Sequence, residues 1–294
     1  MPAAGPPLLS VVLVNHNGRD QLRRCLPSVA PAAPEEGMEI IVVDNDSRDG
    51  SCEFIRRSFP EVHLIALSRN MGFGAANNRG AAAAQGEFLL FLNTDTVVYP
   101  GSLERLLNVL RLNDQAGAAG PALIQEGGRF QVSFGGRVNF FSEMWKKFLG
   151  NFCARLRLKR MRTEKDVVWL SGACLLVRRT AWEQTAGFDE NFFLYFEDID
   201  LCRRLRQKGW RLIYVPSVRF FHEGGASTAS MKMESRLHYR TSQLRFYRKH
   251  NRGWSRACLK LYLMAEYVLF TLRGKWRGKE TLRVWYRKRL TGSA

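Results

Sequence analysis

Short apolar runs alternate with amphipathic stretches through the first hundred residues. The runs are Leu8–Val14, Met38–Val43, Val62–Leu67 and Phe88–Leu92. Continuous apolar runs are typical of strands that are buried on both faces of a parallel sheet. Between the first two runs, Leu22, Leu26 and Val29 follow helical spacing. Strands that alternate with helices predict an α/β fold, with a mostly parallel sheet flanked by helices.

Each of these four runs ends in polar residues. The polar residues at these ends are Asn15 and Asn17, then Asp44, Asn45 and Ser47, then Asn70, and finally Asn93 and Asp95. A single polar ending is equally well explained by a turn. Ligands of open parallel sheets, however, bind beyond the carboxyl ends of the strands, and a carboxylate there can reach a cation that holds a diphosphate. Four such endings predict a nucleotide-sized site along one edge of the sheet.

The predicted site lacks the familiar phosphate-binding loops. The chain contains no G-x-x-x-x-G-K-[ST] motif. The pair Gly72 and Gly74 lacks a third glycine and follows the third strand, so its simplest role is to let the chain turn into a helix that extends to Ala84. We expect Gly86 to close this helix with a positive φ.

The second half of the chain predicts shorter elements. We expect a helix after Pro100, a strand near 118–124, short antiparallel strands within 127–139 and a helix near 179–186. Strand character over Val167–Val177 is interrupted at Ser171 and Gly172. The segments Trp210–Val215 and Val218–Phe221 predict two further strands.

Three acids, Glu197, Asp198 and Asp200, open a predicted helix that extends to Lys208. Acids in the first turn interact favourably with the helix dipole and stabilise a helix by about 0.3–1 kcal/mol each, which is one explanation for their position. They also follow an aromatic and apolar run, and partial burial would make a carboxylate more basic. His222 ends an apolar strand and precedes a glycine-rich segment, which makes it a candidate ligand although a lone histidine is more often structural.

The net charge of +18 is concentrated at the C-terminus. Residues 230–294 carry 17 Lys and Arg and 3 Glu, a net +14. Two or three basic helices rich in Trp and Tyr are expected there, which favours a membrane surface; a solvated basic face packed on the core is the alternative. We therefore divide the chain into a domain at 1–229 and an appendage at 230–294.

Nucleic-acid binding is the rival interpretation from another class, because the pI of about 10.1 and the aromatic residues fit it. No nucleic-acid-binding signature is found, and this interpretation leaves the polar strand ends unexplained. The six cysteines form no C-x-x-C pair, which suits a reducing compartment. Neither a signal peptide nor a transmembrane segment is expected from the pattern.

Taken together, the motifs resemble those of family 2 glycosyltransferases with the GT-A fold, in particular the bacterial rhamnosyltransferase-like branch. The resemblance covers about residues 8–228. The segments that carry it are Val11–Asn17, Ile41–Ser47, Asn70–Asn77, Leu92–Asp95, Trp169–Ala173, Gly187–Asp189, Phe196–Asp200 and His222. Each segment is weak by itself, and their number, order and spacing make the resemblance strong.

The resemblance implies roles for these residues. Asp44 would contact the nucleotide base, and the surrounding pocket would be lined by Asn15, Asn17, Asn45, Ser47, Asn70, Gly72 and Asn93. Asn93-Thr94-Asp95 occupies the position of a D-x-D motif with Asn in the first place, so Asp95 would make most of the contact with Mg²⁺ or Mn²⁺. His222 matches a second metal ligand, and Asp198 matches the general base. The sugar and acceptor would be bordered by Trp169, Gly172, Glu197 and Asp200.

The implied activity is a metal-dependent, inverting hexosyl transfer. The first expectation for the donor is dTDP-L-rhamnose, with another donor such as a UDP-sugar as the alternative. The acceptor would be a hydroxyl of a glycan or a polyprenyl-linked glycan. We expect a cytoplasmic enzyme that binds peripherally at the inner face of the cell membrane and does not bind nucleic acid.

Overall fold

The computed structural model describes residues 5–149, 161–224, 233–272 and 280–288. The chain forms two compact units. The sheet unit comprises residues 1–136, 153–193 and 197–224, and the helical unit comprises residues 137–152, 194–196 and 225–294. The C-terminal segment of the helical unit thus contains the predicted appendage but begins five residues before it, at 225, and the unit includes two further segments from earlier in the chain.

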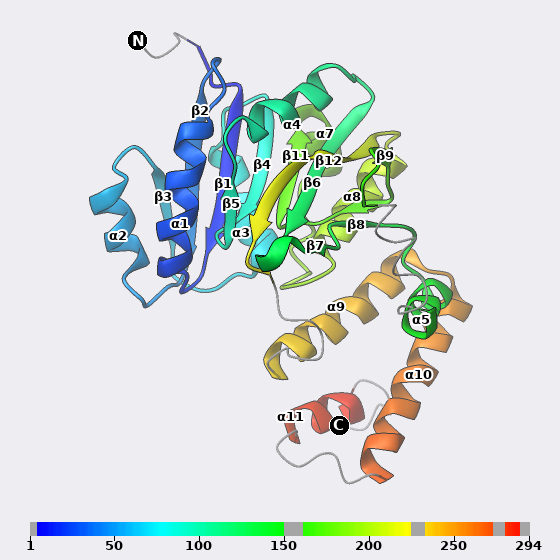
Figure 1. Cartoon of the computed structure of the whole chain (residues 1–294). Helices are drawn as coiled ribbons and strands as arrows, with labels where there is room; N and C mark the ends of the chain where they lie inside the picture. The colour runs from blue at the N-terminus through cyan, green and yellow to red at the C-terminus, as the bar shows by residue number, and fades with distance from the viewer. Residues whose placement is uncertain (1–4, 150–160, 225–232, 273–279, 289–294) are drawn as a thin grey trace. The chain divides into compact units, whose positions relative to one another are not determined.

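The sheet unit is built on one large sheet with the strand order β3-β2-β1-β4-β11-β6-β12-β5 (Figure 1). Its strands are β1 (Leu9–Asn15), β2 (Met38–Asn45), β3 (His63–Leu67), β4 (Phe88–Asn93), β5 (Thr96–Val98), β6 (Ala116–Ile124), β11 (Cys174–Arg178) and β12 (Arg211–His222). The four strands β3, β2, β1 and β4 are parallel. β11 pairs antiparallel with β4 and β6, whereas β12 runs parallel to β6. The expected parallel sheet is therefore the N-terminal half of a mixed sheet.

Two further short strands belong to the large sheet, and two others form a separate two-stranded sheet. These four strands are β7 (Phe130–Gln131), β8 (Phe134–Gly135), β9 (Lys165–Asp166) and β10 (Trp169–Leu170). β7 pairs antiparallel with β6 and β9 with β12, while β8 and β10 pair with each other. The short antiparallel strands expected within 127–139 are therefore present.

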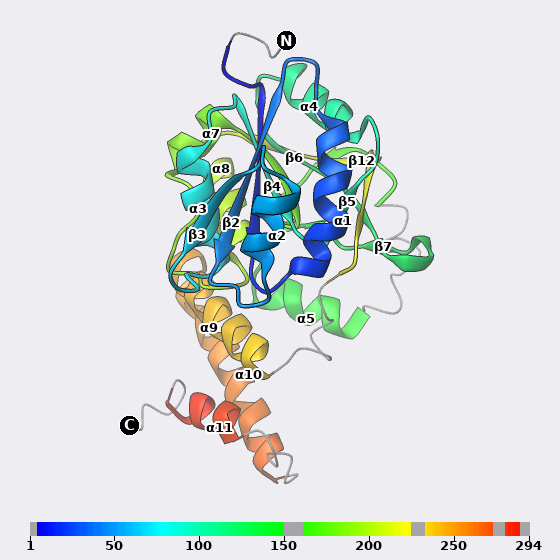
Figure 2. The ribbon, with the colours of Figure 1, turned by 90° about the vertical axis from the view of Figure 1, so that its left-hand side faces the viewer.

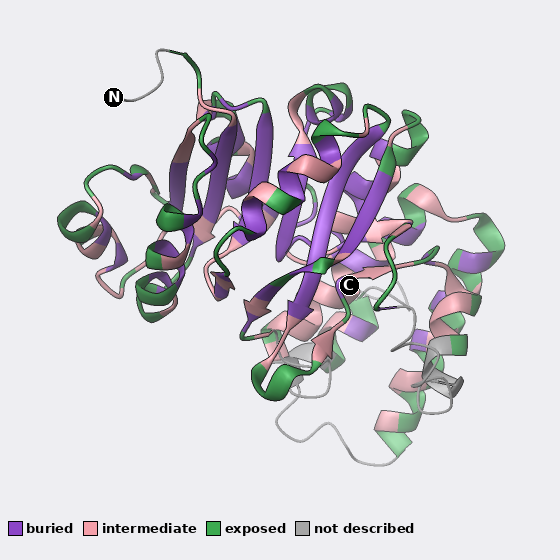
Figure 3. Cartoon of the chain, turned by 45° about the horizontal axis from the view of Figure 1, so that its top comes forward, coloured by how far each residue is buried: buried purple, intermediate pink, exposed green. Residues whose placement is uncertain are grey.

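Helices cover both faces of the sheet (Figure 2). The helices α1 (Arg19–Val29), α2 (Ser51–Ser58) and α4 (Ser102–Arg111) contribute to one apolar core. The helices α3 (Phe73–Ala83), α7 (Arg179–Thr185) and α8 (Glu197–Gln207) contribute to the core on the other face. Because both faces are covered, the strands of the large sheet are mostly buried (Figure 3). Every residue from Phe88 to Leu92 is buried, which explains the absence of alternation in this run.

Two local expectations were wrong. α3 ends at Ala83, and its C-cap Ala84 has a φ of −72°, so Gly86 does not close the helix. Gly86 instead lies against β1, where an added Cβ would come within 2.6 Å of the Ser10 backbone nitrogen. The two strands expected at 210–221 form the single strand β12, which shifts register against β6 between Val215 and Arg219.

The helical unit contains α5 (Phe140–Leu149), α9 (Met233–His250), α10 (Gly253–Leu272) and α11 (Glu280–Tyr286). Glu266 on α10 joins its helices, because it accepts hydrogen bonds from Arg240 at 3.0 Å and from the Tyr286 hydroxyl at 2.6 Å. No helix in the described part of the chain is long and apolar enough to cross a membrane. The cysteines that the structure describes are free.

Candidate active site

The carboxyl ends of β1 and β2 bring the predicted base-binding residues together. Asn15 and Asp44 are register partners on these parallel strands. Asn15 Nδ2 donates to Asp44 Oδ2 at 2.9 Å and lies 3.0 Å from Ser47 Oγ, and the Ser47 amide donates to Asp44 Oδ1 at 3.0 Å. Asp44 is buried, with 2% of its surface exposed. The three residues therefore form one hydrogen-bonded cluster.

The rim of this cluster is held by backbone and amide contacts. Asn17 has a left-handed backbone with a φ of 54°, and its side-chain oxygen accepts from the Arg48 amide at 2.7 Å. Asn45 Nδ2 donates to Asn70 Oδ1 at 2.9 Å, which joins the end of β2 to the end of β3. Gly72 has a φ of +86°, and an added Cβ would come within 2.3 Å of the Phe193 carbonyl oxygen.

One buried acceptor in this cluster remains open. Asn15 Oδ1 has no hydrogen-bond partner among the described residues. A buried polar atom without a partner costs about 1–3 kcal/mol, so such an atom in a native structure calls for an explanation. A ligand donor bound at the carboxyl ends of these strands would satisfy it, which fits the nucleotide-sized site expected at this edge.

A second cluster forms where β4 ends beside β12. His222 Nε2 lies 3.1 Å from Asp95 Oδ1 and 3.4 Å from Asn93 Nδ2. His222 is buried, whereas the Asp95 side chain is 28% exposed. Burial by itself raises the pKa of Asp95, but the hydrogen bond and charge of His222 and two backbone hydrogen bonds outweigh it, so the pKa is lowered. Asp95 is therefore kept ionised.

Gln131, which was not among the predicted site residues, contacts the other ring nitrogen of His222. The distance from His222 Nδ1 to Gln131 Oε1 is 2.6 Å. Because an amide oxygen can only accept, Nδ1 donates to Gln131, and Nε2 is the ring nitrogen that faces Asp95. Nε2 donates a hydrogen bond to Asp95 when the ring is charged and offers a lone pair to a cation when the ring is neutral. Gln131 belongs to the two-residue strand β7, and no sequence pattern marked it.

The donor set of this cluster suits a divalent cation. A carboxylate oxygen and an imidazole lone pair 3.1 Å apart repel each other unless a proton or a cation lies with them. Over residues 5–149, 161–224, 233–272 and 280–288, no group of three or more acidic, His or Cys side chains is placed to hold a metal. Two protein ligands are nevertheless enough when substrate phosphates complete the coordination, as is usual for Mg²⁺.

Asp198 lies in the first turn of α8 and is held by two backbone donors. Gly172 donates to Asp198 Oδ2 at 2.9 Å, and the Ile199 amide donates to Oδ1 at 2.7 Å. Desolvation raises the pKa of Asp198 although these hydrogen bonds oppose it. Desolvation and the nearby charge of Asp198 also raise the pKa of Glu197, whose Oε2 has no partner among the described residues. Asp198 and Glu197 therefore both have a raised pKa, and the two backbone hydrogen bonds fix the position of the Asp198 carboxylate.

The backbone just before these acids is strained. Tyr195 and Phe196 have φ values of 68° and 69°, a left-handed conformation that bulky residues rarely adopt. Such conformations cost about 1–3 kcal/mol each and concentrate at functional sites. Phe196 is held there by its ring contacts with Tyr239 at 5.3 Å and Phe246 at 5.4 Å.

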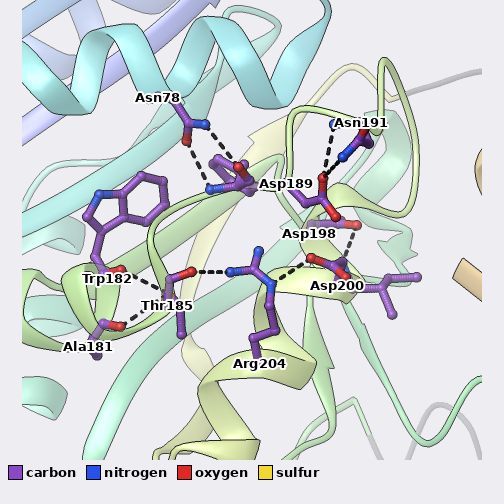
Figure 4. A network of polar contacts seen from close by, with 11 residues as sticks. Asn78, Ala181, Trp182, Thr185, Asp189, Asn191, Asp198, Asp200 and Arg204 are labelled. Carbon is purple, nitrogen blue, oxygen red and sulfur yellow. Dashed lines mark hydrogen bonds and ion pairs between the residues drawn. The ribbon is translucent and has the colours of Figure 1, made fainter. Parts of the chain in front are cut away.

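Asp200 differs from its neighbour Asp198 in its surroundings. Its side chain is fully buried, and Asp200 Oδ2 accepts from Arg204 Nε at 2.7 Å (Figure 4). Arg204 in turn donates to the Thr185 carbonyl at 2.6 Å. This ion pair anchors α8 to the end of α7, so we do not include Asp200 among the acceptor-binding residues proposed below.

The loop between β10 and β11 connects the end of β4, next to the Asp95–His222 cluster, to the Glu197–Asp198 pair on α8. The Ala173 carbonyl accepts from the Asn93 amide at 3.0 Å, and the adjacent Gly172 donates to Asp198. An added Cβ on Gly172 would come within 3.3 Å of the Asp198 Cβ. Trp169 begins β10 and packs its indole over Gly135, with Nε1 buried and without a partner among the described residues. The end of β4 and the first turn of α8 are thus linked through two consecutive residues.

The mixed sheet with polar clusters at its carboxyl edge is the arrangement expected from the resemblance to the GT-A fold. The model of the family described as "Glycosyltransferase like family 2" matches residues 6–257. The chain belongs to this family, and both the resemblance and the expected fold are confirmed. The match also extends past residue 228, where the motifs of the sequence analysis end.

Two curated relatives are named as rhamnosyltransferases. The N-acetylglucosaminyl-diphospho-decaprenol L-rhamnosyltransferase of Mycobacterium tuberculosis is 32% identical over 280 residues, which cover 89% of this chain and 91% of the relative. The rhamnosyltransferase WbbL of Escherichia coli K12 is 26% identical, with 73% of this chain and 83% of the relative covered. The similarity to the mycobacterial enzyme therefore spans nearly both chains.

The solved structures that resemble this chain share its fold. A mannosyltransferase from Pyrobaculum calidifontis in complex with GDP-Man and Mn²⁺ superimposes with a TM-score of 0.60 at 16% identity, over 96% of this chain and 84% of that chain. GalNAc-T7 with UDP, GalNAc and Mn²⁺ superimposes with a TM-score of 0.57 at 20% identity, over 74% and 44% of the two chains. The protein is a glycosyltransferase enzyme.

Proposed function

We propose that this glycosyltransferase transfers L-rhamnose from dTDP-L-rhamnose, with inversion, to a hydroxyl of a polyprenyl-linked glycan. The observation that carries the proposal is the link from the end of β4 to Asp198 through Ala173 and Gly172. This link supports a shared site, in which Asp198 would act as the base and the Asp95–His222 cluster would hold the diphosphate through a cation. The names of the two rhamnosyltransferase relatives support the sugar, and the name of the mycobacterial relative also supports the acceptor.

Asp198 is the proposed general base. Each of its oxygens accepts one backbone hydrogen bond and keeps a lone pair for the acceptor hydroxyl. As Asp198 takes the hydroxyl proton, the acceptor oxygen bonds to the anomeric carbon and the bond to the donor diphosphate breaks. A general base of this kind contributes about 10²–10⁴-fold to the rate. Because the acceptor attacks directly, no covalent enzyme intermediate is needed and the anomeric configuration inverts.

Asp95 and His222 are the proposed metal ligands, with Mg²⁺ or Mn²⁺ as the metal. Solved structures with this fold contain Mn²⁺, and the Asp95–His222 pair has the donor chemistry for it. When bound, the ion would supply Lewis-acid stabilisation to the departing diphosphate. Gln131 keeps the proton of His222 on Nδ1, so that Nε2 remains available as a ligand.

The Asp44 cluster is the proposed base site. A carboxylate that already accepts from Asn15 and Ser47 can accept the ring N–H of thymine or uracil with a remaining lone pair. Asn15 Oδ1 offers a further open acceptor. Asn17, Asn45, Asn70, Gly72 and Asn93 complete the donor pocket, and Trp169, Gly172 and Glu197 border the sugar and acceptor. Because both bases present this N–H, a UDP-sugar remains the alternative donor.

The proposed polyprenyl-linked acceptor would bring the enzyme to a membrane surface. A polyprenyl chain is buried in the bilayer, so an enzyme that extends its glycan from the cytoplasm must reach the inner face of the membrane. The net +14 charge of residues 230–294 supports peripheral contact with anionic lipid, at about 1 kcal/mol per basic residue near the surface.

A donor screen tests this function. The purified chain is incubated with Mn²⁺, an N-acetylglucosaminyl-diphospho-polyprenol and one nucleotide-sugar at a time, and the released nucleoside diphosphate is measured. We expect release from dTDP-L-rhamnose that depends on the acceptor. Release from a UDP-sugar instead would change the donor assignment, and no release from any nucleotide-sugar would contradict the proposal.

A further inference from the structure

Helix α10 of the helical unit has three distinct faces. Successive residues turn by about 100° around a helix, so residues three, four and seven apart share a face. One face is packed in the unit through Ser255, Leu259 and Leu263, all of which are buried. A second face is apolar and exposed; its large side chains are Trp254, Leu261, Met264, Val268 and Leu272. The exposed fractions of Leu261 and Leu272 are 65% and 79%, so this face is unusual for a surface helix.

Helix α5 extends the exposed apolar face with aromatic side chains. Phe141 and Trp145 lie one helical turn apart and are 66% and 68% exposed. The Phe141 ring lies 5.3 Å from the Trp254 ring, and the Phe140 amide donates to Ser255 Oγ at 3.3 Å, which fixes α5 against the start of α10. The apolar face therefore includes three exposed aromatic rings from two helices.

The third face of α10 borders a basic cavity. A cavity of about 470 Å³ lies between α9 and α10, and four of its lining residues are Arg245, Arg248, Arg256 and Lys260. The described residues that line it include no carboxylate, and within that part of the chain none of these four cations forms an ion pair. Ala257 lines the same cavity and lies between the apolar and basic faces of α10. The cavity thus combines four uncompensated charges with an adjoining apolar edge.

We infer that this surface is a lipid-binding site, in which the cavity takes the phosphate of an anionic phospholipid and the apolar face of α5 and α10 enters the acyl layer. The inference deepens the membrane contact proposed above by naming the residues that make it. Charge complementarity selects the anionic headgroup, because four cations converge without an acid. Exposed Leu, Val and Met beside two Trp favour a bilayer interface, because an acyl layer takes up a broad aliphatic surface, whereas phosphates and bases are bound mainly by basic, polar and aromatic side chains.

Vesicle sedimentation with the full chain tests the cavity. Wild type is compared on phosphatidylcholine vesicles and on an equimolar mixture of phosphatidylcholine and phosphatidylglycerol. We expect binding to the mixed vesicles and at least about a hundredfold loss of partitioning in the cavity variant, since four charges are removed. The substitutions in this variant are Arg245→Gln, Arg248→Gln, Arg256→Gln and Lys260→Gln.

A control variant removes the same charge from exposed positions of the sheet unit. Its substitutions are Arg56→Gln, Arg57→Gln, Arg105→Gln and Lys208→Gln. We expect it to lose less than about tenfold, because the charges that it lacks are not at the binding surface. Equal losses in the two variants would mean that net charge alone drives binding and would overturn the cavity assignment.

Fluorescence quenching by lipids with brominated acyl chains tests the apolar face. We expect quenching that falls strongly with Trp145→Phe plus Trp254→Phe and is unchanged with Trp210→Phe. Leu261→Ser with Val268→Ser should weaken binding at an unchanged melting temperature. Should that pair not fold, the milder tryptophan variants still decide the question. Binding without quenching of these two residues would overturn the insertion of this face.

Competition with soluble glycerol phosphate and with duplex DNA tests whether the cavity binds the phosphate of a lipid or that of another molecule. A third measurement, of donor binding, separates the lipid-binding site from the proposed glycosyl transfer. If soluble glycerol phosphate displaces the vesicles, or if duplex DNA binds through the cavity residues, the lipid assignment is wrong. Donor binding is measured in parallel without lipid. A cavity variant that loses vesicles and keeps donor binding supports the site, whereas a wild type that binds vesicles and no donor would contradict the proposed glycosyl transfer and not the lipid-binding site.

Discussion

The two units of this protein handle polar and apolar groups in opposite ways. In the sheet unit, the polar residues Asn15, Asp44 and His222 are buried and hydrogen-bonded, and the apolar strands are covered on both faces. In the helical unit, Leu261 and Trp145 are exposed and Arg256 lies at a cavity without an acidic partner among the described residues. A buried polar cluster fixes the geometry that chemistry needs, whereas an exposed apolar and basic surface is suited to docking. Variants should therefore separate catalysis from membrane binding.

The largest expected effect comes from Asp95→Ala. Loss of this carboxylate should abolish the divalent-dependent part of donor binding, because the diphosphate loses its link to the protein through the cation. Isothermal titration with donor, with and without Mn²⁺, measures this. Asp114→Ala, an exposed acid of the same unit, is the matched control and should bind as wild type does. An Asp95→Ala variant that still responds to Mn²⁺ would disprove the ligand assignment.

Asp198→Asn should lower turnover by about 10²-fold or more, because the amide cannot accept the acceptor proton. The variant keeps the size of the side chain and the contact of its oxygen with the Gly172 amide, so donor affinity and vesicle binding should stay near wild-type values. Initial rates at saturating donor provide the measurement. Near-normal turnover would move the base role to Glu197 or end the inverting hypothesis.

Gln131→Met should weaken divalent affinity by about 10–100-fold, the usual cost of losing a residue that orients a metal-binding histidine. Methionine keeps the length of the side chain but offers no strong acceptor to His222 Nδ1. Gln131→Glu retains an acceptor and should restore affinity, which a purely packing role would not explain. Titration with Mn²⁺ monitored by its electron paramagnetic resonance signal separates the two variants.

The smallest expected effect is a displacement of the pH profile. An ordinary aspartate has a pKa of about 3.9, and desolvation raises the pKa of Asp198 above its usual value. The base is deprotonated above its pKa, so kcat should fall at a higher pH on the acid side than an exposed aspartate would allow. Glu197→Gln should leave the acid side of this pH profile unchanged, because burial is the main cause of the raised pKa of Asp198. A limb that is unchanged in Asp198→Asn would assign it to another group.

The sequence predicted the parts of the fold that depend on local pattern. The buried strand at Phe88–Leu92 and the polar ends of β1 and β2 follow from residue order alone, and the structure brings Asn15, Asp44 and Ser47 together as expected. The antiparallel insertion of β11 between β4 and β6 could not be predicted, because the pairing joins residues more than fifty positions apart.

The sequence identified site residues only where the type of residue and its place in a motif were sufficient to suggest a role. Asp198 and Asp200 look alike in sequence, and their different roles follow from the helix: Asp200 meets Arg204 four residues later, on the buried side of α8. Gln131 could not be found, because its importance comes from a 2.6 Å contact with His222 that joins β7 to β12. The strain at Tyr195 and Phe196 likewise depends on tertiary contacts that no local pattern records.

The anomeric configuration of the product tests the central claim most directly. Proton NMR of the disaccharide formed from dTDP-L-rhamnose and an N-acetylglucosaminyl acceptor reports the configuration at the anomeric carbon. Direct attack assisted by Asp198 predicts a product whose configuration is opposite to that of the donor. A product that retains the donor configuration would contradict the assignment of Asp198 as a general base in a single displacement.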